Sequence, residues 1–127
     1  MPASDEPIPV VLAQDPLMHG EPVEHLVSAV RGHVQAGSSC VVVDLGEVRW
    51  VNSKGLGALM SGLISCRNAG GDMAIARANE KVMSLLMIAQ LQDFFDTYDT
   101  VEEAVTELED WRERLVGDEG PQEEMGG

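Results

Sequence analysis

The sequence predicts one α/β domain with a mostly parallel sheet of about four strands and about four helices packed on it. Short runs of β-branched and other apolar residues alternate with longer segments whose apolar residues recur at helical spacing. The chain has 127 residues, the size of a single domain, and can bury roughly two thirds of the surface that its unfolded form exposes. Such alternation is typical of parallel sheets, because parallel strands need long crossovers.

The four expected strands are short. Residues 40–45 (CVVVDL) are apolar almost throughout, which predicts a strand buried on both faces of the sheet. The other three expected strands are residues 8–13 (IPVVLA), 73–76 (MAIA) and 94–98 (FFDTY).

The segments between these runs each place apolar residues on one helical face. The four faces are Val23, Leu26, Val27, Val30 and Val34; Leu56, Leu59, Met60, Leu63 and Ile64; Val82, Leu85, Leu86 and Ala89; and Val101, Ala104, Val105 and Leu108. Pro22 suits a first helical turn and Gly37 suits the residue after a helix. Asn79 is expected to cap the third helix, and Thr100 with Glu103 forms a capping box for the fourth.

The expected domain covers residues 8–116. Its predicted core includes Cys40, Val42, Leu59, Leu63 and Leu85. Residues 1–7 and 117–127 are rich in proline, glycine and acidic residues, so we expect both ends to be disordered tails, the second of them acidic.

Charge and composition restrict the possible partners. The chain carries 22 Asp and Glu against 8 Lys and Arg, a formal net charge of −14, so nucleic acid and anionic membrane surfaces are poor partners. No signal peptide or long apolar span is recognisable, so we expect a cytoplasmic protein without membrane insertion. Cys40 and Cys66 lack disulfide or metal-site spacing and are expected to be buried thiols. The oligomeric state stays open.

The stretch VNSKGLGALM, residues 51–60, forms an unusual corner. Residues 46–52 are expected to leave the carboxyl end of a strand and lead into the second helix, where parallel sheets carry functional loops. Ser53 then lies at or beside the N-cap, a position that Asn and Ser favour because their side chains accept a backbone N–H. Gly55 and Gly57 each weaken a helix by up to about 1 kcal/mol relative to Ala, which indicates backbone that something approaches closely.

Residues 41–63 (VVVDLGEVRWVNSKGLGALMSGL) resemble the core of the STAS domain of bacterial anti-sigma factor antagonists. That family has an apolar strand ending in Asp-Leu, a spacer with Val and an aromatic residue, and Ser-x-Gly-Leu opening a helix. The matching residues are Asp44, Leu45, Val48, Trp50, Ser53, Gly55 and Leu56. Residues 69–105 are similar to the family's later strand, helix, short strand and final helix, so the resemblance covers residues 8–110.

The resemblance implies a binding switch rather than an enzyme. In these antagonists a GHKL-type kinase, which is itself the anti-sigma factor, phosphorylates the serine that Ser53 matches, and a PPM-type phosphatase reverses this. The unmodified form binds the kinase and frees a sigma factor. The implied phosphorylation site is therefore Ser53, and the implied partner-binding patch is Gly46, Glu47, Arg49, Trp50, Asn52, Ser53, Lys54, Gly55 and Leu56.

A phosphate on Ser53 would add about −1.5 to −2 charges to a surface that the partner must cover, so binding and phosphorylation would exclude each other. Asp44 and Glu47 would add repulsion, and Arg49 and Lys54 would offset part of it.

The sequence departs from the family pattern in several places. Asn52 stands where the family usually has Asp, Lys54 replaces a small residue, and Gly46 replaces a hydroxyl residue. The family usually has two strands before its first helix, and the residues before His19 leave room for one, so an edge strand is missing or is supplied by a partner.

A second function stays open, in which Ser53 is only a helix cap. The chain would then be a constitutive STAS subunit that docks on another protein, such as the ATPase of a lipid-transport ABC complex or a stress-signalling scaffold.

No other motif points to chemistry. His19, His25 and His33 lack the spacing of a metal site, and the sequence around Ser53 is neither a nucleophile elbow nor a phosphate-binding loop. We therefore expect no enzymatic activity, no metal and no cofactor. Nine acids and one base between residues 93 and 113 predict an acidic face, either solvated or complementary to a basic partner.

Overall fold

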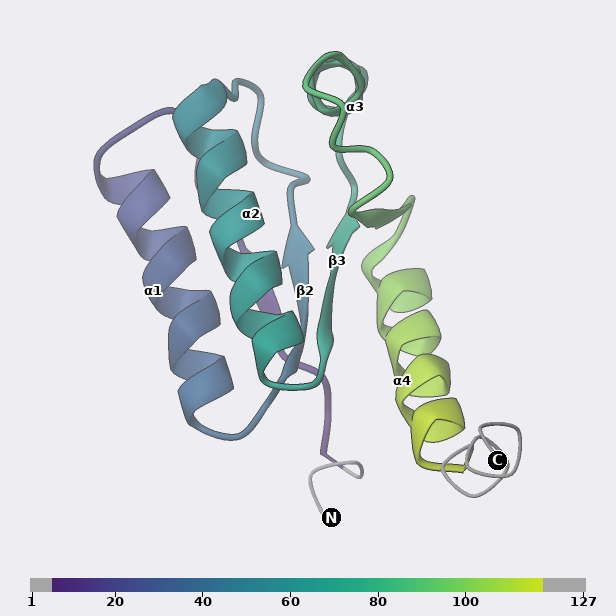
Figure 1. Cartoon of the computed structure of the whole chain (residues 1–127). Helices are drawn as coiled ribbons and strands as arrows, with labels where there is room; N and C mark the ends of the chain where they lie inside the picture. The colour runs from purple at the N-terminus through teal and green to yellow at the C-terminus, as the bar shows by residue number, and fades with distance from the viewer. Residues whose placement is uncertain (1–5, 118–127) are drawn as a thin grey trace.

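A computed structural model describes residues 6–117 of the chain (Figure 1). The four strands pair in parallel in the order β1-β2-β3-β4, which confirms the predicted α/β domain. The elements in chain order are β1 (Val10–Leu12), α1 (Glu21–Gln35), β2 (Cys40–Asp44), α2 (Ser53–Asn68), β3 (Asp72–Ala76), α3 (Glu80–Ile88), β4 (Asp96–Tyr98) and α4 (Val101–Gly117).

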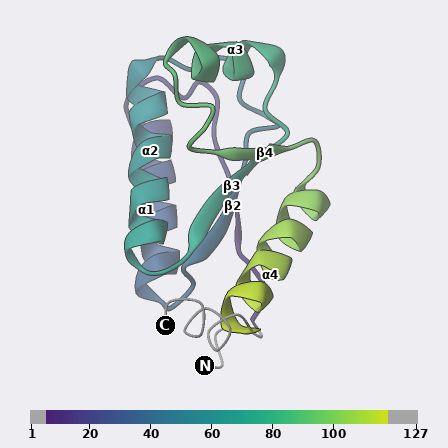
Figure 2. The same ribbon diagram turned by 45° about the vertical axis from the view of Figure 1, so that its right-hand side comes forward.

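The helices cover the sheet unevenly. α1 and α2 lie side by side on one face, α4 crosses the other face, and α3 lies across the end of the sheet (Figure 1, Figure 2). Parallel strands that follow one another in a sheet have right-handed crossovers, which place successive helices on the same face. α4 follows the last strand and folds back over the face that this rule leaves open.

β2 is the centre of the domain, and all five of its residues are buried. Val41 and Val43 belong to the larger apolar cluster with α1 and α2, whereas Cys40 and Val42 belong to the smaller cluster under α4. This alternation follows from the pleat of a strand, which points successive side chains to opposite faces. The predicted burial of Cys40, Val42, Leu59 and Leu63 is confirmed.

The expectation that Leu85 lies in the core is wrong. Val82 and Leu86 of α3 are fully buried, whereas Leu85 is only partly buried. Because α3 lies across the end of the sheet rather than flat on a face, one narrow side of it reaches the core. Met87 and Ile88 are consequently 61% and 78% exposed.

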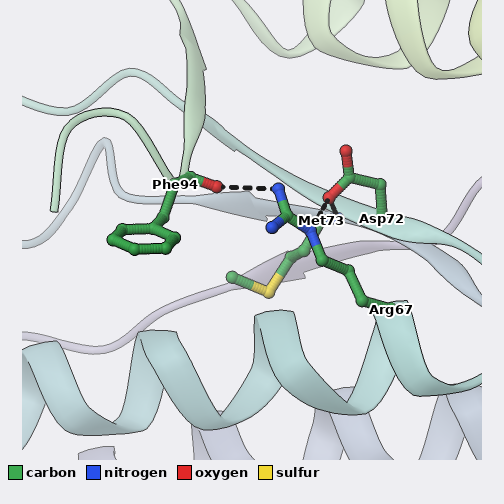
Figure 3. A network of polar contacts seen from close by, with 4 residues as sticks. All are labelled: Arg67, Asp72, Met73 and Phe94. Carbon is green, nitrogen blue, oxygen red and sulfur yellow. Dashed lines mark hydrogen bonds and ion pairs between the residues drawn. The ribbon is translucent and has the colours of Figure 1, made fainter.

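The last strand also begins later than predicted, at Asp96 instead of residue 94. Phe94 is 44% exposed, and its carbonyl accepts a hydrogen bond of 3.0 Å from Nη2 of Arg67. The same guanidinium contacts Oδ1 of Asp72 through Nε at 3.1 Å, as Figure 3 shows. Arg67 thereby ties the end of α2 to the start of β3 and to the turn before β4.

The predicted helix boundaries are confirmed. Pro22 lies in the first turn of α1, and Gly37, with φ of 105°, follows its end. Oδ1 of Asn79 accepts the N–H of Val82 at 2.9 Å, which caps α3. Oγ1 of Thr100 accepts the N–H of Glu103 at 3.0 Å at the start of α4.

The expected tails fall largely on residues 1–5 and 118–127, which lie outside the described residues. Gly117 ends α4, and the carbonyl of Glu6 accepts a hydrogen bond of 3.0 Å from Nη2 of Arg112. One strand, β1, precedes α1 within residues 6–117, as the sequence predicts. None of the helices described in that range is long and apolar enough to cross a membrane.

The two cysteines give a pH-dependent prediction. Burial raises the pKa of Cys40 and raises that of Cys66 from 9.0 to about 12, because a thiolate loses its hydration in apolar surroundings. The folded-state pKa of Cys66 lies above its ordinary value. The stability that the protonated, buried thiol contributes is therefore complete below pH 9 and is lost as the pH rises towards 12. We predict slow reaction of both thiols with iodoacetamide in the native protein just below pH 9 and fast reaction in urea.

Mass spectrometry of timed samples measures the reaction at each cysteine. Native Cys66 that is alkylated as fast as the unfolded chain would contradict the burial described above.

Candidate functional site

Asp44, at the end of β2, is the one buried charged side chain among the residues described. Its Oδ1 accepts the backbone N–H of Gly46 at 2.9 Å and Nε of Arg77 at 2.8 Å. The hydrogen bond to the Asp44 carboxylate raises the pKa of Arg77. Because Arg77 follows directly after β3, the ion pair joins the carboxyl ends of the two central strands.

Gly46 and Arg77 are complementary in shape. A Cβ at position 46 would overlap the guanidinium of Arg77, so a larger residue requires that end of the Arg77 side chain to move. Arg77 has a φ of 61°, in the left-handed region that costs a non-glycine residue of order 1–2 kcal/mol. The contact with Asp44 and a hydrogen bond of 2.9 Å from its N–H to the carbonyl of Tyr98 offset that cost.

This ion pair corrects one electrostatic expectation. Asp44 was expected to repel a phosphate on Ser53, but the guanidinium of Arg77 neutralises it at 2.8 Å. Glu47, which is exposed, is the remaining acid of the loop.

The loop between β2 and α2 is held by the segment that precedes α1. Oδ1 of Asp15 accepts the backbone N–H groups of Arg49 at 2.7 Å and Trp50 at 3.1 Å. The N–H of Leu17 donates to the carbonyl of Trp50 at 2.9 Å. No sequence pattern marked Asp15, because the contact spans 34 positions.

The same loop is held from α3 as well. Val48 is buried, and its N–H donates to the carbonyl of Leu45 at 3.0 Å. Nδ2 of Asn79 donates to the carbonyl of Val48 at 3.2 Å, while the other amide atom of Asn79 caps α3. The loop is therefore fixed to the rest of the domain on both sides.

Ser53 is the first residue of α2, and Asn52 is the N-cap. Oδ1 of Asn52 accepts the N–H groups of Lys54 at 3.0 Å and Gly55 at 3.1 Å. Ser53 is exposed, and its hydroxyl has no hydrogen-bond partner within residues 6–117. Ser53 therefore lies beside the N-cap, within the prediction, and Asn52 rather than Ser53 caps the helix.

The predicted patch residues gather at the carboxyl end of the sheet, but not all of them reach the surface. Gly46, Glu47, Arg49, Trp50, Ser53 and Lys54 are exposed, and Asn52 is partly buried. Gly55 and Leu56 are buried, so they support the patch from below. None of the described residues forms a group of three or more His, Cys, Asp and Glu that could hold a metal ion.

The two glycines of α2 differ in their surroundings. A Cβ on Gly55 would overlap the carbonyl oxygen of Leu17, so the close approach expected from the sequence is made by the chain's own backbone. A Cβ on Gly57 would meet nothing within 4 Å. Gly55 is thus required by packing, and nothing in the structure explains Gly57.

Trp50, in this loop, lies beside α3 and is 52% exposed. Nζ of Lys81, in the first turn of α3, lies 3.9 Å from the centroid of its ring. Sequence reasoning placed Trp50 in the patch but missed Lys81, because nothing local to either residue indicates that α3 lies beside the loop.

Known proteins resemble the chain over most of its length. The sequence model of the STAS domain matches residues 5–104. A Thermotoga maritima protein named as a candidate anti-sigma factor antagonist is 32% identical over 72 residues, which cover 57% of this chain and 64% of that protein. Its Thermotoga neapolitana homologue is 32% identical over 73 residues, 58% of this chain and 65% of that protein. The chain thus spans just under two thirds of the length of these relatives.

Solved structures share the fold. The solution structure of the Thermotoga maritima protein TM1081 is 26% identical with a TM-score of 0.68, covering 78% of this chain and 79% of that one. The phosphorylated form of the Bacillus cell fate determinant SpoIIAA is 14% identical with a TM-score of 0.62, covering 81% of this chain and 93% of that one. The second likeness shows the fold alone.

The glycines of α2 provide a matched pair of variants. Gly55→Ala is expected to lower the free energy of unfolding by more than about 1 kcal/mol, because the new methyl group meets a backbone oxygen that cannot move easily. Gly57→Ala is expected to raise it by about 0.5–1 kcal/mol, because alanine favours the helix and enters open space. Urea denaturation measures both, and effects of the same sign would contradict the placement of α2 against Leu17.

The N-cap of α2 provides a second matched pair of variants. Asn52→Ala removes the acceptor for two backbone N–H groups and should lower the free energy of unfolding by about 0.5–2 kcal/mol. Ser53→Ala removes an exposed hydroxyl without a partner and should change it by less than about 0.5 kcal/mol. The same denaturation experiment tests this, and a larger loss for Ser53→Ala than for Asn52→Ala would contradict the assignment of the cap.

Proposed function

The chain belongs to the STAS domain family, and we propose that it is an anti-sigma factor antagonist that acts as a phosphorylation-gated switch. It binds a GHKL-type anti-sigma kinase when Ser53 is unphosphorylated and leaves it when Ser53 carries a phosphate. A PPM-type phosphatase restores the unmodified form, and the cycle takes place in the cytoplasm. The 32% identity to a candidate antagonist supports this general role.

The observation that carries the proposal is the state of the Ser53 hydroxyl. It is exposed and without a hydrogen bond among the described residues, on a loop that Asp15 and Asn79 hold in place. A kinase can therefore reach Oγ without unfolding the helix end. In this proposal the kinase supplies the base that activates the hydroxyl, and the chain is its substrate.

The phosphate would remain at the surface. A helix N-terminus attracts anions through its free N–H groups and its dipole, but Asn52 already occupies the N–H groups of Lys54 and Gly55. Those two N–H groups are thus not available to a phosphate on Ser53, which in this proposal projects towards the partner. Its charge of about −1.5 to −2 then opposes the contact.

The surrounding charges set how strongly binding is opposed. Arg77 neutralises Asp44, so the phosphate and Glu47 provide the repulsion. Arg49 and Lys54 are both exposed and offset part of it. The contact surface in this proposal is formed by Gly46, Glu47, Arg49, Trp50, Asn52, Ser53 and Lys54, with Gly55 and Leu56 beneath it.

The alternative is constitutive docking on an ABC-transporter ATPase or a signalling scaffold. That function gives Ser53 only the role of a helix cap, and Asn52 fills that role. We therefore favour the switch.

The test combines the purified chain with the GHKL-type kinase encoded nearest to its gene. Wild type is expected to gain one phosphate with ATP, and Ser53→Ala to gain none while it still binds. Ser53→Glu should bind at least about tenfold more weakly, because it adds a charge to a desolvated contact. Intact-mass spectrometry and calorimetric titration measure the two effects.

Ser28→Glu is the matched control, since Ser28 is exposed in the middle of α1; it should bind like wild type. If neither wild type nor Asn52→Asp gains phosphate, and Ser53→Glu binds like wild type, constitutive docking replaces the switch.

A further inference from the structure

A groove of about 430 Å³ lies between the loop that carries Trp50 and α3. Leu85 and Ile88 line it together with the indole, and Ile88 is 78% exposed. Trp50, which also lines the groove, is 52% exposed. Soluble proteins rarely leave several large apolar side chains uncovered in one place, and such patches mark interaction sites.

The composition of the groove is that of an anchor site. Tryptophan is among the residues that most often dominate the binding energy of an interface. By contrast, Ile64 is exposed on α2 but does not line this groove. The groove therefore differs from an isolated apolar side chain on a helix surface.

The charge of the groove is opposite to that of the chain. The protein has 22 acidic and 8 basic residues, yet Arg49 and Lys81 line the groove against one acid, Glu80. The exposed helix α4 shows the usual balance, with six acids and two bases in the sequence VEEAVTELEDWRERLVG. An acidic segment is repelled by most of this surface and attracted to the groove.

Lys81 is already placed for such a ligand. Its Nζ lies 3.9 Å from the centroid of the Trp50 ring. A carboxylate that enters beside the indole therefore meets an ammonium group, while an apolar neighbour in the same segment can contact Leu85 and Ile88.

We propose that this groove binds a peptide segment of a protein partner in which an acidic residue lies next to apolar residues. The choice of a protein as the occupant rests on the proposed function, because Arg49 and Trp50 belong to the loop that leads to Ser53. The groove thus adds a second contact, beside Ser53, through which the partner is recognised.

The test uses a display library of short random peptides and needs neither kinase nor ATP. Peptides selected on the wild-type chain are expected to combine Asp or Glu with aliphatic or aromatic residues. Synthetic copies should bind at least about tenfold more weakly to Ile88→Asp and to Lys81→Glu, measured by calorimetry. Ile64→Asp, the matched control outside the groove, should bind like wild type, and binding to wild type should weaken with added salt.

Three results would overturn the inference. The first is the absence of acidic-apolar sequences from the selection, and the second is binding that neither Ile88→Asp nor Lys81→Glu affects. The third is a wild-type dimer in sedimentation that Ile88→Asp dissociates and Ile64→Asp does not, which would assign the groove to a second copy of the chain. Failure of Ser53 to accept phosphate would remove the switch but would leave the peptide result unchanged, so the two proposals fail separately.

Discussion

The ion pair between Asp44 and Arg77 joins the carboxyl ends of β2 and β3, and the candidate site above these ends depends on that contact. A buried carboxylate without a partner would cost several kcal/mol, so Asp44 fixes the position of Arg77 at 2.8 Å. The same Oδ1 accepts the N–H of Gly46, which sets the first turn of the loop. The backbone N–H of Arg77 in turn donates to the carbonyl of Tyr98, so the residues of this ion pair join β2, β3 and β4.

From that point the loop is fixed by contacts rather than by regular secondary structure. Asp15, Leu17 and Asn79 satisfy its backbone groups from two sides. Asn52 then completes the start of α2, which leaves the hydroxyl of Ser53 free among the described residues. A rigid surface with one free functional group suits a protein that is recognised in one state and rejected in another, because little ordering is needed on binding.

Local patterns in the sequence predicted the fold well. The strands, the faces of α1 and α2, and the caps at Asn79 and Thr100 depend on neighbouring residues, so periodicity and capping rules found them. The contacts that build the site span 33 positions between Asp44 and Arg77 and 34 between Asp15 and Arg49, and no local pattern names such partners. Leu85 failed as a core prediction for a similar reason, since its burial depends on how α3 crosses the end of the sheet.

Side chains outside the loop before Ser53 hold that loop in one conformation, and amide hydrogen exchange followed by NMR measures this at each N–H group. We expect slow exchange at Gly46, Arg49 and Trp50, whose N–H groups donate to Asp44 and Asp15. In Asp15→Ala, protection should be lost at Arg49 and Trp50 and kept at Gly46. Exchange of all three amides in the wild type at the rate of an unfolded chain would show that these contacts do not hold the loop.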